Sequence, residues 1–151
     1  MRVLSTLEEA WALRRGKKLV FTNGVFDILH AGHAIYLESA RALGDLLIVG
    51  LNSDASARGL GKGPGRPVFE LADRARVVAA LRCVDAVVAF DEPTPEATIA
   101  ALKPDVHVKG GDYRAEDMPE TPLVRSYGGE VVILPYVAGR STTEALRRLG
   151  L

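Results

Sequence analysis

Two histidines, His30 and His33, stand three residues apart at the end of the segment T-N-G-V-F-D-I-L-H-A-G-H. Residues three apart lie on one face of a helix, so both imidazoles point the same way if a helix begins near His30. The first backbone N–H groups of a helix have no partner within it and favour anions. Two imidazoles beside such groups predict a phosphate-binding site. Gly24 directly follows an apolar segment, where a missing side chain lets a ligand approach closely.

Two other interpretations of the histidine pair stay open. In the first, the two imidazole rings form hydrogen bonds with nearby backbone groups and have a purely structural role. They can also form part of a zinc site, but helical zinc sites more often use histidines four residues apart, and no third ligand stands out. We therefore expect phosphate binding and no metal held by protein side chains.

A glycine-rich loop, G-K-G-P-G-R-P-V, carries two cations, Lys62 and Arg66. Glycines permit motion, and lysine and arginine neutralise phosphate charge, so the composition predicts a mobile flap that closes over a phosphorylated ligand. The alternative is a solvated surface loop without a ligand.

Two more segments combine glycines with polar groups. V-K-G-G-D-Y places Lys109 and Gly110 at the end of a predicted strand, although a tight turn with an incidental lysine would have the same pattern. G-R-S-T-T supplies three successive hydroxyl groups, Ser141 to Thr143, of which simple helix capping needs only one. Both segments favour contacts with phosphate groups.

Taken together, the histidine pair, the glycine-rich loop and the two later segments resemble the motifs of the nucleotidyltransferase superfamily that includes cytidylyltransferases and pantetheine-phosphate adenylyltransferase. H-A-G-H, preceded by G-V-F-D-I-L, is similar to its H-x-G-H signature, and S-T-T is similar to its second signature at a C-terminal helix. The motifs extend from Thr22 to Thr143, which is nearly the whole chain. In this superfamily the two histidines contact the phosphates of a nucleoside triphosphate and stabilise charge as pyrophosphate leaves.

The resemblance implies roles for particular residues. Catalytic roles are implied for His30, His33 and Lys62. Contacts with the nucleotide are implied for Asn23, Gly24, Val25, Phe26, His30, His33, Arg74, Lys109, Gly110, Ser141, Thr142 and Thr143. Contacts with the second substrate are implied for Asp27, Asn52, Lys62 and Arg66.

One branch, the adenylyltransferases of ADP-heptose synthesis, matches best. N-S-D-A-S at 52–56, K-G-x-x-R-P-V and V-K-G-G-D-Y all look like that branch. It implies transfer of AMP from ATP, with Mg²⁺, to heptose 1-phosphate. In many bacteria such a domain is fused to a sugar kinase; no kinase segment is present here, so a separate kinase is expected to act upstream. Arg140 departs from the pattern, because related enzymes usually carry a small or apolar residue before the S-T-T signature.

Three rival functions remain. A CTP-dependent cytidylyltransferase acting on glycerol 3-phosphate usually has R-T-x-G before the second signature, where this chain has Y-V-A-G at 136–139. An FAD synthetase of the archaeal type has the same fold. A non-catalytic nucleotide sensor would explain the binding motifs, but it would not need both histidines and the flap lysine. A dehydrogenase is not expected, since no G-x-G-x-x-G follows the first strand.

Alternating strands and helices must position these groups. Continuously apolar strands are expected at 18–22, 46–51, 86–90, 106–109 and 130–135, which is typical of a parallel sheet covered on both faces. Helices are expected at about 6–15, 34–43, 71–81, 95–102, 122–127 and 142–149, with a capping box at Ser5 and Glu8 and an N-cap at Ser141. We expect one α/β domain over 1–151, with a Rossmann-like, doubly wound, parallel five-stranded sheet and the ligand site at the strand carboxyl ends.

Composition narrows the class of protein. The 151 residues are 48% hydrophobic and 25% charged, as in an ordinary globular domain. Nineteen basic and nineteen acidic residues cancel, which argues against a nucleic-acid partner. The single Cys83 cannot form an internal disulfide, and no apolar run reaches the roughly 20 residues that span a bilayer, so we expect a cytoplasmic protein with no membrane contact. Related enzymes are often homodimers, and the sequence leaves that state open.

Overall fold

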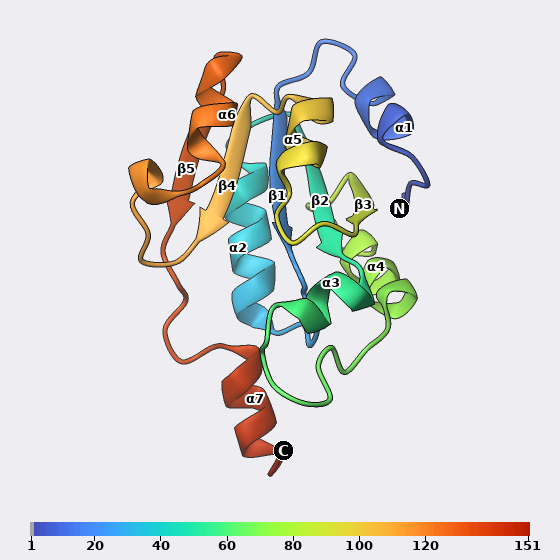
Figure 1. The fold of residues 1–151 in the computed structure, drawn as a ribbon, viewed down its shortest axis with the longest axis vertical. Helices are drawn as coiled ribbons and strands as arrows, with labels where there is room; N and C mark the ends of the chain where they lie inside the picture. Colours follow the sequence, from blue (N-terminus) through green and yellow to red (C-terminus); the bar gives the residue numbers. More distant parts are fainter. Residues whose placement is uncertain (1) are drawn as a thin grey trace.

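The computed structural model describes residues 2–151 and contains a five-stranded parallel sheet. The strands are β1 (Leu19–Gly24), β2 (Leu46–Asn52), β3 (Ala86–Phe90), β4 (Val106–Gly110) and β5 (Glu130–Leu134). Their order in the sheet is β3-β2-β1-β4-β5, with every neighbouring pair parallel (Figure 1). The chain reverses its direction of travel across the sheet between β1 and β4, which is where ligands bind in such sheets.

Helices cover both faces of the sheet, as predicted (Figure 1). On one face, α2 (Ala31–Arg41) and α4 (Leu71–Ala79) bury Leu37 and Val78 against the sheet. On the other, α1 (Leu7–Ala12), α5 (Glu96–Leu102) and α6 (Thr121–Ser126) pack against Leu19 and Phe21. Side chains of successive strand residues alternate between these two cores, which explains why the strands are apolar at every position.

Most element boundaries lie within three residues of those expected, and a few details differ. The N-terminal capping box is Thr6 with Glu9 instead of Ser5 with Glu8, so that prediction was wrong by one residue. Helix α2 starts three residues earlier than predicted, because His30 is its N-cap. Two short elements were not predicted, α3 (Asp54–Gly59) and the 3₁₀ helix η1 (Ala115–Asp117).

The last helix, α7 (Thr142–Arg148), begins after the N-cap Ser141, whose hydroxyl accepts a hydrogen bond from the Glu144 N–H at 3.0 Å. None of its residues is buried. Figure 1 shows α7 beyond the carboxyl ends of the strands, on the same side of the molecule as α3 and the loop that follows it. Within residues 2–151, no helix has the length and apolar character needed to cross a bilayer.

Candidate active site

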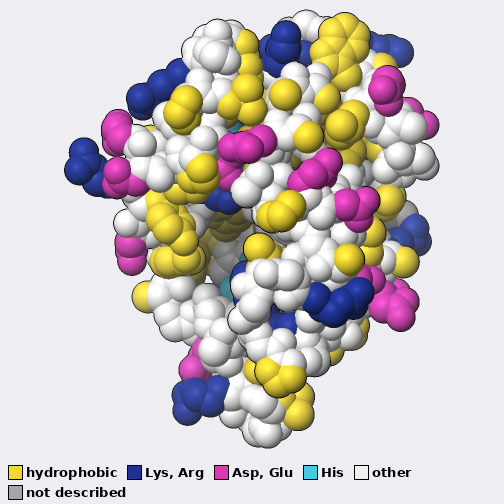
Figure 2. All heavy atoms as spheres, in the orientation of Figure 1, with side chains coloured by type: hydrophobic (Ala, Val, Ile, Leu, Met, Phe, Trp, Pro, Cys, Tyr) yellow, Lys and Arg dark blue, Asp and Glu magenta, His cyan; other side chains and the backbone are white. Residues whose placement is uncertain are grey.

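A cavity of about 950 Å³ opens at the carboxyl ends of β1 and β4. This volume is at the upper end of the range for small-molecule sites. The face drawn in Figure 2 is hollowed near its centre, and histidine and lysine or arginine side chains are visible at the hollow. Most of the residues expected at the site line the cavity, namely Asn23, Gly24, Val25, Phe26, Asp27, His30, His33, Lys62, Arg66, Gly110, Ser141, Thr142 and Thr143.

Each histidine of the pair uses one ring nitrogen to cap the start of α2 and the other ring nitrogen as a hydrogen-bond donor. His30 Nδ1 accepts the Gly32 N–H at 3.1 Å, and His33 Nδ1 accepts the His30 N–H at 3.3 Å. The two rings stack with centroids 3.9 Å apart. A neutral imidazole that accepts at Nδ1 carries its proton on Nε2. Each histidine therefore satisfies a backbone group with one nitrogen and presents an N–H donor with the other, so the structural role does not exclude phosphate binding.

The surroundings of both imidazoles lower their pKa and so favour the neutral form. Burial lowers the pKa of His33 to about 4, and the positive fields of His30 and Lys62 act in the same direction. Burial also lowers the pKa of His30, with the nearby Arg140 guanidinium adding to the shift. Above about pH 5, His33 therefore donates a hydrogen bond without itself changing charge.

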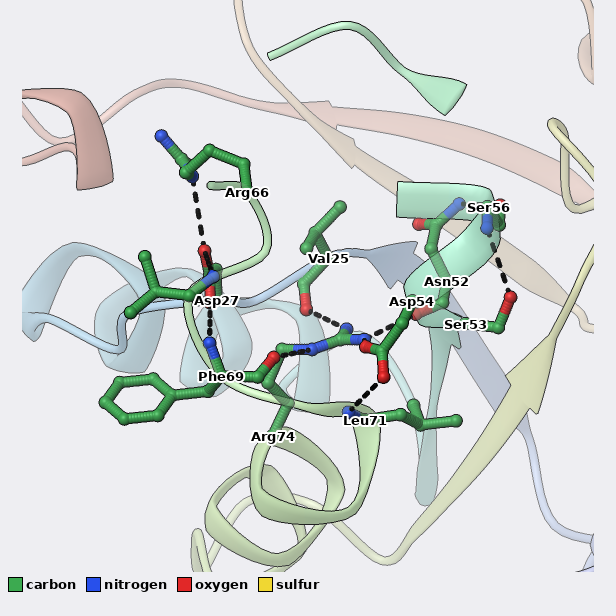
Figure 3. A network of polar contacts seen from close by, with 11 residues as sticks. Val25, Asp27, Asn52, Ser53, Asp54, Ser56, Arg66, Phe69, Leu71 and Arg74 are labelled. Atoms are coloured by element: carbon green, nitrogen blue, oxygen red, sulfur yellow. Dashed lines mark hydrogen bonds and ion pairs between the residues drawn. The ribbon is translucent and has the colours of Figure 1, made fainter. Parts of the chain in front are cut away.

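Asp27 ties the glycine-rich loop to the end of β1 (Figure 3). Its side chain is 2% exposed, and the carboxylate accepts hydrogen bonds from the backbone N–H groups of Val68 and Phe69, at 2.8 and 2.9 Å, and from Arg66 Nε–H at 3.2 Å. Lys62 lies on the exposed part of the same loop and faces the cavity. Asp27 lines the cavity as expected, but its oxygens are used to hold the loop that carries both cations.

Arg74 and Asn52 do not line the cavity. The Arg74 side chain is buried, and its guanidinium donates to the carbonyl oxygens of Val25, Asn52 and Phe69 and to Asp54 Oδ1. All three of its nitrogens are engaged by the protein, so the nucleotide contact implied by the resemblance is not available in this conformation. Arg74 instead connects the ends of β1 and β2 to the start of α4.

Lys109 and Gly110 end β4 beside the cavity. Lys109 Nζ lies 3.5 Å from Asn23 Oδ1 and 3.9 Å from Glu120 Oε1, and burial lowers its pKa. A side chain at Gly110 would meet the Tyr36 ring, since an added Cβ would lie 3.1 Å from it. Glycine is therefore required for β4 to end so close to α2.

Sequence reasoning missed Tyr36, which also lines the cavity. Its hydroxyl lies 2.6 Å from Thr22 Oγ1 and donates to the Val108 carbonyl at 3.1 Å, which links α2 to β1 and β4. Burial raises its pKa to about 12, so the hydroxyl keeps its proton. The signal was available in the sequence, because Tyr36 follows His33 by three residues and so lies on the same helical face.

The segment between β5 and α7 completes the cavity wall. Thr142 Oγ1 lies 3.5 Å from the Ile28 carbonyl, near the start of α2. Glu144 also lines the cavity and was not expected there; Arg147 and Arg148 hold its carboxylate at distances of 2.7 and 3.0 Å. Sequence reasoning also missed the stretch 135–138, which contributes to the wall next to Gly139 and Arg140.

The described residues contain no cluster of three or more histidine, cysteine, aspartate or glutamate side chains placed to hold a metal ion. The two carboxylates on the cavity, Asp27 and Glu144, are both occupied by protein donors. A cation that enters with a nucleotide would therefore be coordinated by phosphate oxygens and water.

Comparison with known proteins identifies the family. Residues 21–133 match the cytidylyltransferase-like family. The chain belongs to this family. The matched region contains the histidine pair, the glycine-rich loop and β2 to β4, with most of β1 and β5.

Two curated relatives are similar over most of this chain. The D-beta-D-heptose 1-phosphate adenylyltransferase of Bordetella bronchiseptica is 50% identical over 151 residues, which cover 98% of this chain and 93% of that protein. The bifunctional protein HldE of Syntrophotalea carbinolica is 57% identical over 136 residues, which cover 90% of this chain. The chain spans only 28% of the length of that HldE protein.

Solved structures agree with the fold. The lipopolysaccharide core biosynthesis protein from Thermoplasma volcanium superimposes with a TM-score of 0.66 at 33% identity, covering 81% of this chain and 98% of that protein. Pantothenate synthetase from Thermus thermophilus reaches a TM-score of 0.61 at 19% identity, which supports the fold alone.

Proposed function

We propose that the protein is an adenylyltransferase that transfers AMP from ATP, bound as its Mg²⁺ complex, to heptose 1-phosphate. The products are ADP-heptose and pyrophosphate. The observation that carries the proposal is the stacked histidine pair, whose two Nε2–H donors face a cavity lined by further cations and hydroxyl groups. The similarity to the Bordetella adenylyltransferase, which covers nearly all of both chains, supports the choice of nucleotide and acceptor.

The reaction needs no covalent intermediate and no general base. An oxygen of the acceptor phosphate, already ionised at neutral pH, attacks the α-phosphorus of ATP. The bond from the α-phosphorus to the bridging oxygen breaks, and its electron pair leaves with pyrophosphate. Catalysis then consists of positioning the two phosphates and stabilising the charge that develops on the leaving group.

The chain's own residues match these needs. His30 and His33 donate from Nε2 to oxygens of the triphosphate, and the Nδ1 hydrogen bonds keep these donors in place. Lys62 closes over the phosphates on a loop that Asp27 anchors. Ser141, Thr142 and Thr143 line the part of the cavity next to Arg140, which suits the β- and γ-phosphates. Removing one such donor typically slows an enzyme about a hundred- to a thousand-fold.

Asn23, Gly24, Val25, Phe26 and Gly110 lie at the strand ends, where the rest of the nucleotide would bind. Lys109 is placed to act there indirectly, through Asn23. A sugar kinase would supply the phosphorylated acceptor, and both substrates are available in the cytoplasm, where we propose that the protein acts.

The test is a pyrophosphate-release assay with Mg²⁺, in which ATP and CTP are each combined with heptose 1-phosphate, glycerol 3-phosphate and FMN. Turnover with ATP and heptose 1-phosphate alone is expected. Turnover with CTP and glycerol 3-phosphate would instead indicate a cytidylyltransferase, and turnover with ATP and FMN would indicate an FAD synthetase. Nucleotide binding without turnover in any combination would favour a non-catalytic sensor.

A further inference from the structure

Three of the five acidic or basic side chains of the cavity wall already have charged partners. Asp27 pairs with Arg66, and Glu144 pairs with two arginines of α7 outside the cavity. The other two charged side chains of the wall are Lys62 and Arg140, and neither forms an ion pair within residues 2–151. The cavity therefore presents two uncompensated positive charges.

Both cations line the same cavity as the histidine pair, and each is near a different histidine. Lys62 is close enough to lower the pKa of His33 and also that of Lys109 at the end of β4. Arg140 is close enough to lower the pKa of His30, the N-cap of α2. A phosphate chain that contacts both imidazoles would thus also be attracted by Lys62 and Arg140, which line the same cavity.

The stem of Arg140 packs over Gly32 in the first turn of α2. A Cβ added at Gly32 would lie 3.1 Å from the Arg140 Cβ and 2.8 Å from His30 Cε1. The Arg140 backbone N–H also donates to the Val137 carbonyl at 3.3 Å, which closes a turn before α7. The Arg140 Cβ therefore lies against the histidine motif, and its guanidinium has no hydrogen-bond or ion-pair partner within residues 2–151.

We propose that Arg140 is a further catalytic residue, which binds the β- and γ-phosphates of the nucleotide and the pyrophosphate that leaves. The proposal extends the nucleotidyltransferase function proposed above. Arg140 directly precedes the Ser141–Thr143 hydroxyls, which line the same cavity, and its Cβ lies over Gly32 in the first turn of α2. A planar guanidinium can donate two parallel hydrogen bonds to a phosphate, which a lysine cannot.

Calorimetric binding of inorganic pyrophosphate and of AMP, each measured separately, tests the assignment. Arg140→Met should weaken pyrophosphate binding roughly ten- to a hundred-fold, the effect of losing a hydrogen bond between charged groups, and should leave AMP binding unchanged. The pyrophosphate affinity of Arg140→Lys should lie between those of Arg140→Met and the unaltered protein, because lysine keeps the positive charge but lacks the planar guanidinium. Arg148→Met is the matched control, since it removes the same charge from α7 outside the cavity.

Unchanged pyrophosphate binding in Arg140→Met would overturn the proposal, as would an equal loss in Arg148→Met or an equal loss of AMP binding. Failure to detect pyrophosphate binding to the unaltered protein would overturn it as well. The measurement needs no acceptor and no turnover, so it stays informative even if every substrate combination in the release assay proves inactive.

Discussion

Replacing Asp27 by asparagine removes one charge and one acceptor while conserving the shape of the side chain. The carboxylate accepts three N–H groups, from Val68, Phe69 and Arg66, at 2.8, 2.9 and 3.2 Å. Asparagine has a single acceptor oxygen, so its NH₂ group must face either the Phe69 N–H or the other two donors. At least one hydrogen bond is lost, and the others lose their charge assistance.

The size of the effect follows from these contacts. A hydrogen bond to a charged group contributes about 1.5–3 kcal/mol, and a neutral one about 0.5–1.5 kcal/mol. Losing one bond and weakening the rest should cost about 2–4 kcal/mol of local stability in the loop. The Val68 and Phe69 amides should then exchange with solvent deuterium roughly 30- to 900-fold faster. The kcat/KM for pyrophosphate release should fall, because Lys62 and Arg66 lose their fixed position.

Glu70→Gln provides the matched control, because this exposed carboxylate adjoins the same segment and its side chain makes no capping hydrogen bond. Amide exchange and kcat/KM should match those of the unaltered protein. Unchanged exchange at Val68 and Phe69 in Asp27→Asn would refute the anchoring role, and so would equal acceleration in the control.

Four further outcomes are expected. His30→Ala and His33→Ala should each lower kcat about a hundred- to a thousand-fold with little change in thermal unfolding, and an unchanged rate would remove that histidine from the mechanism. Lys62→Ala should slow turnover while its unfolding transition persists; loss of that transition would indicate a structural role. Arg74→Met should lower the free energy of unfolding, measured with denaturant, by about 3–5 kcal/mol, because the buried carbonyl oxygens and Asp54 lose their partner. A smaller loss of stability together with a reduced nucleotide affinity would instead indicate that Arg74 contacts the nucleotide. Burial and the field of Lys109 lower the pKa of His107 to about 3, so below pH 6.5 the unfolded chain binds a proton that the folded chain does not. The free energy of unfolding should thus fall as pH drops from 6.5 toward 3, by at most about 1.4 kcal/mol per pH unit from this residue, and His107→Leu should show a smaller pH dependence.

The strands were predictable because their pattern is local. Runs such as 46–51 are short and apolar at every position, as expected for a strand buried on both faces, and the observed β2 extends this run by one residue. Helix starts were less predictable. Ser5 with Glu8 and Thr6 with Glu9 have the same spacing, and the sequence alone does not choose between them. In the folded chain the capping box of Thr6 and Glu9 begins a helix that buries Ala10 in the core between the sheet and α1, α5 and α6. This contact exists only once the chain has folded.

For the site, the sequence by itself determined the chemistry of the histidine pair, the glycine-rich loop and the S-T-T segment, because each motif is contiguous and its spacing sets a local geometry. Only the tertiary structure decided how the charged side chains are used. Arg74 points inward because its acceptors come from the ends of β1 and β2 and from the start of α4, which are brought together only by the fold. The fold likewise decides which groups surround the charged side chains of Asp27 and Arg140. Asp27 has Arg66 and two backbone N–H groups beside it, and Arg140 has the open cavity.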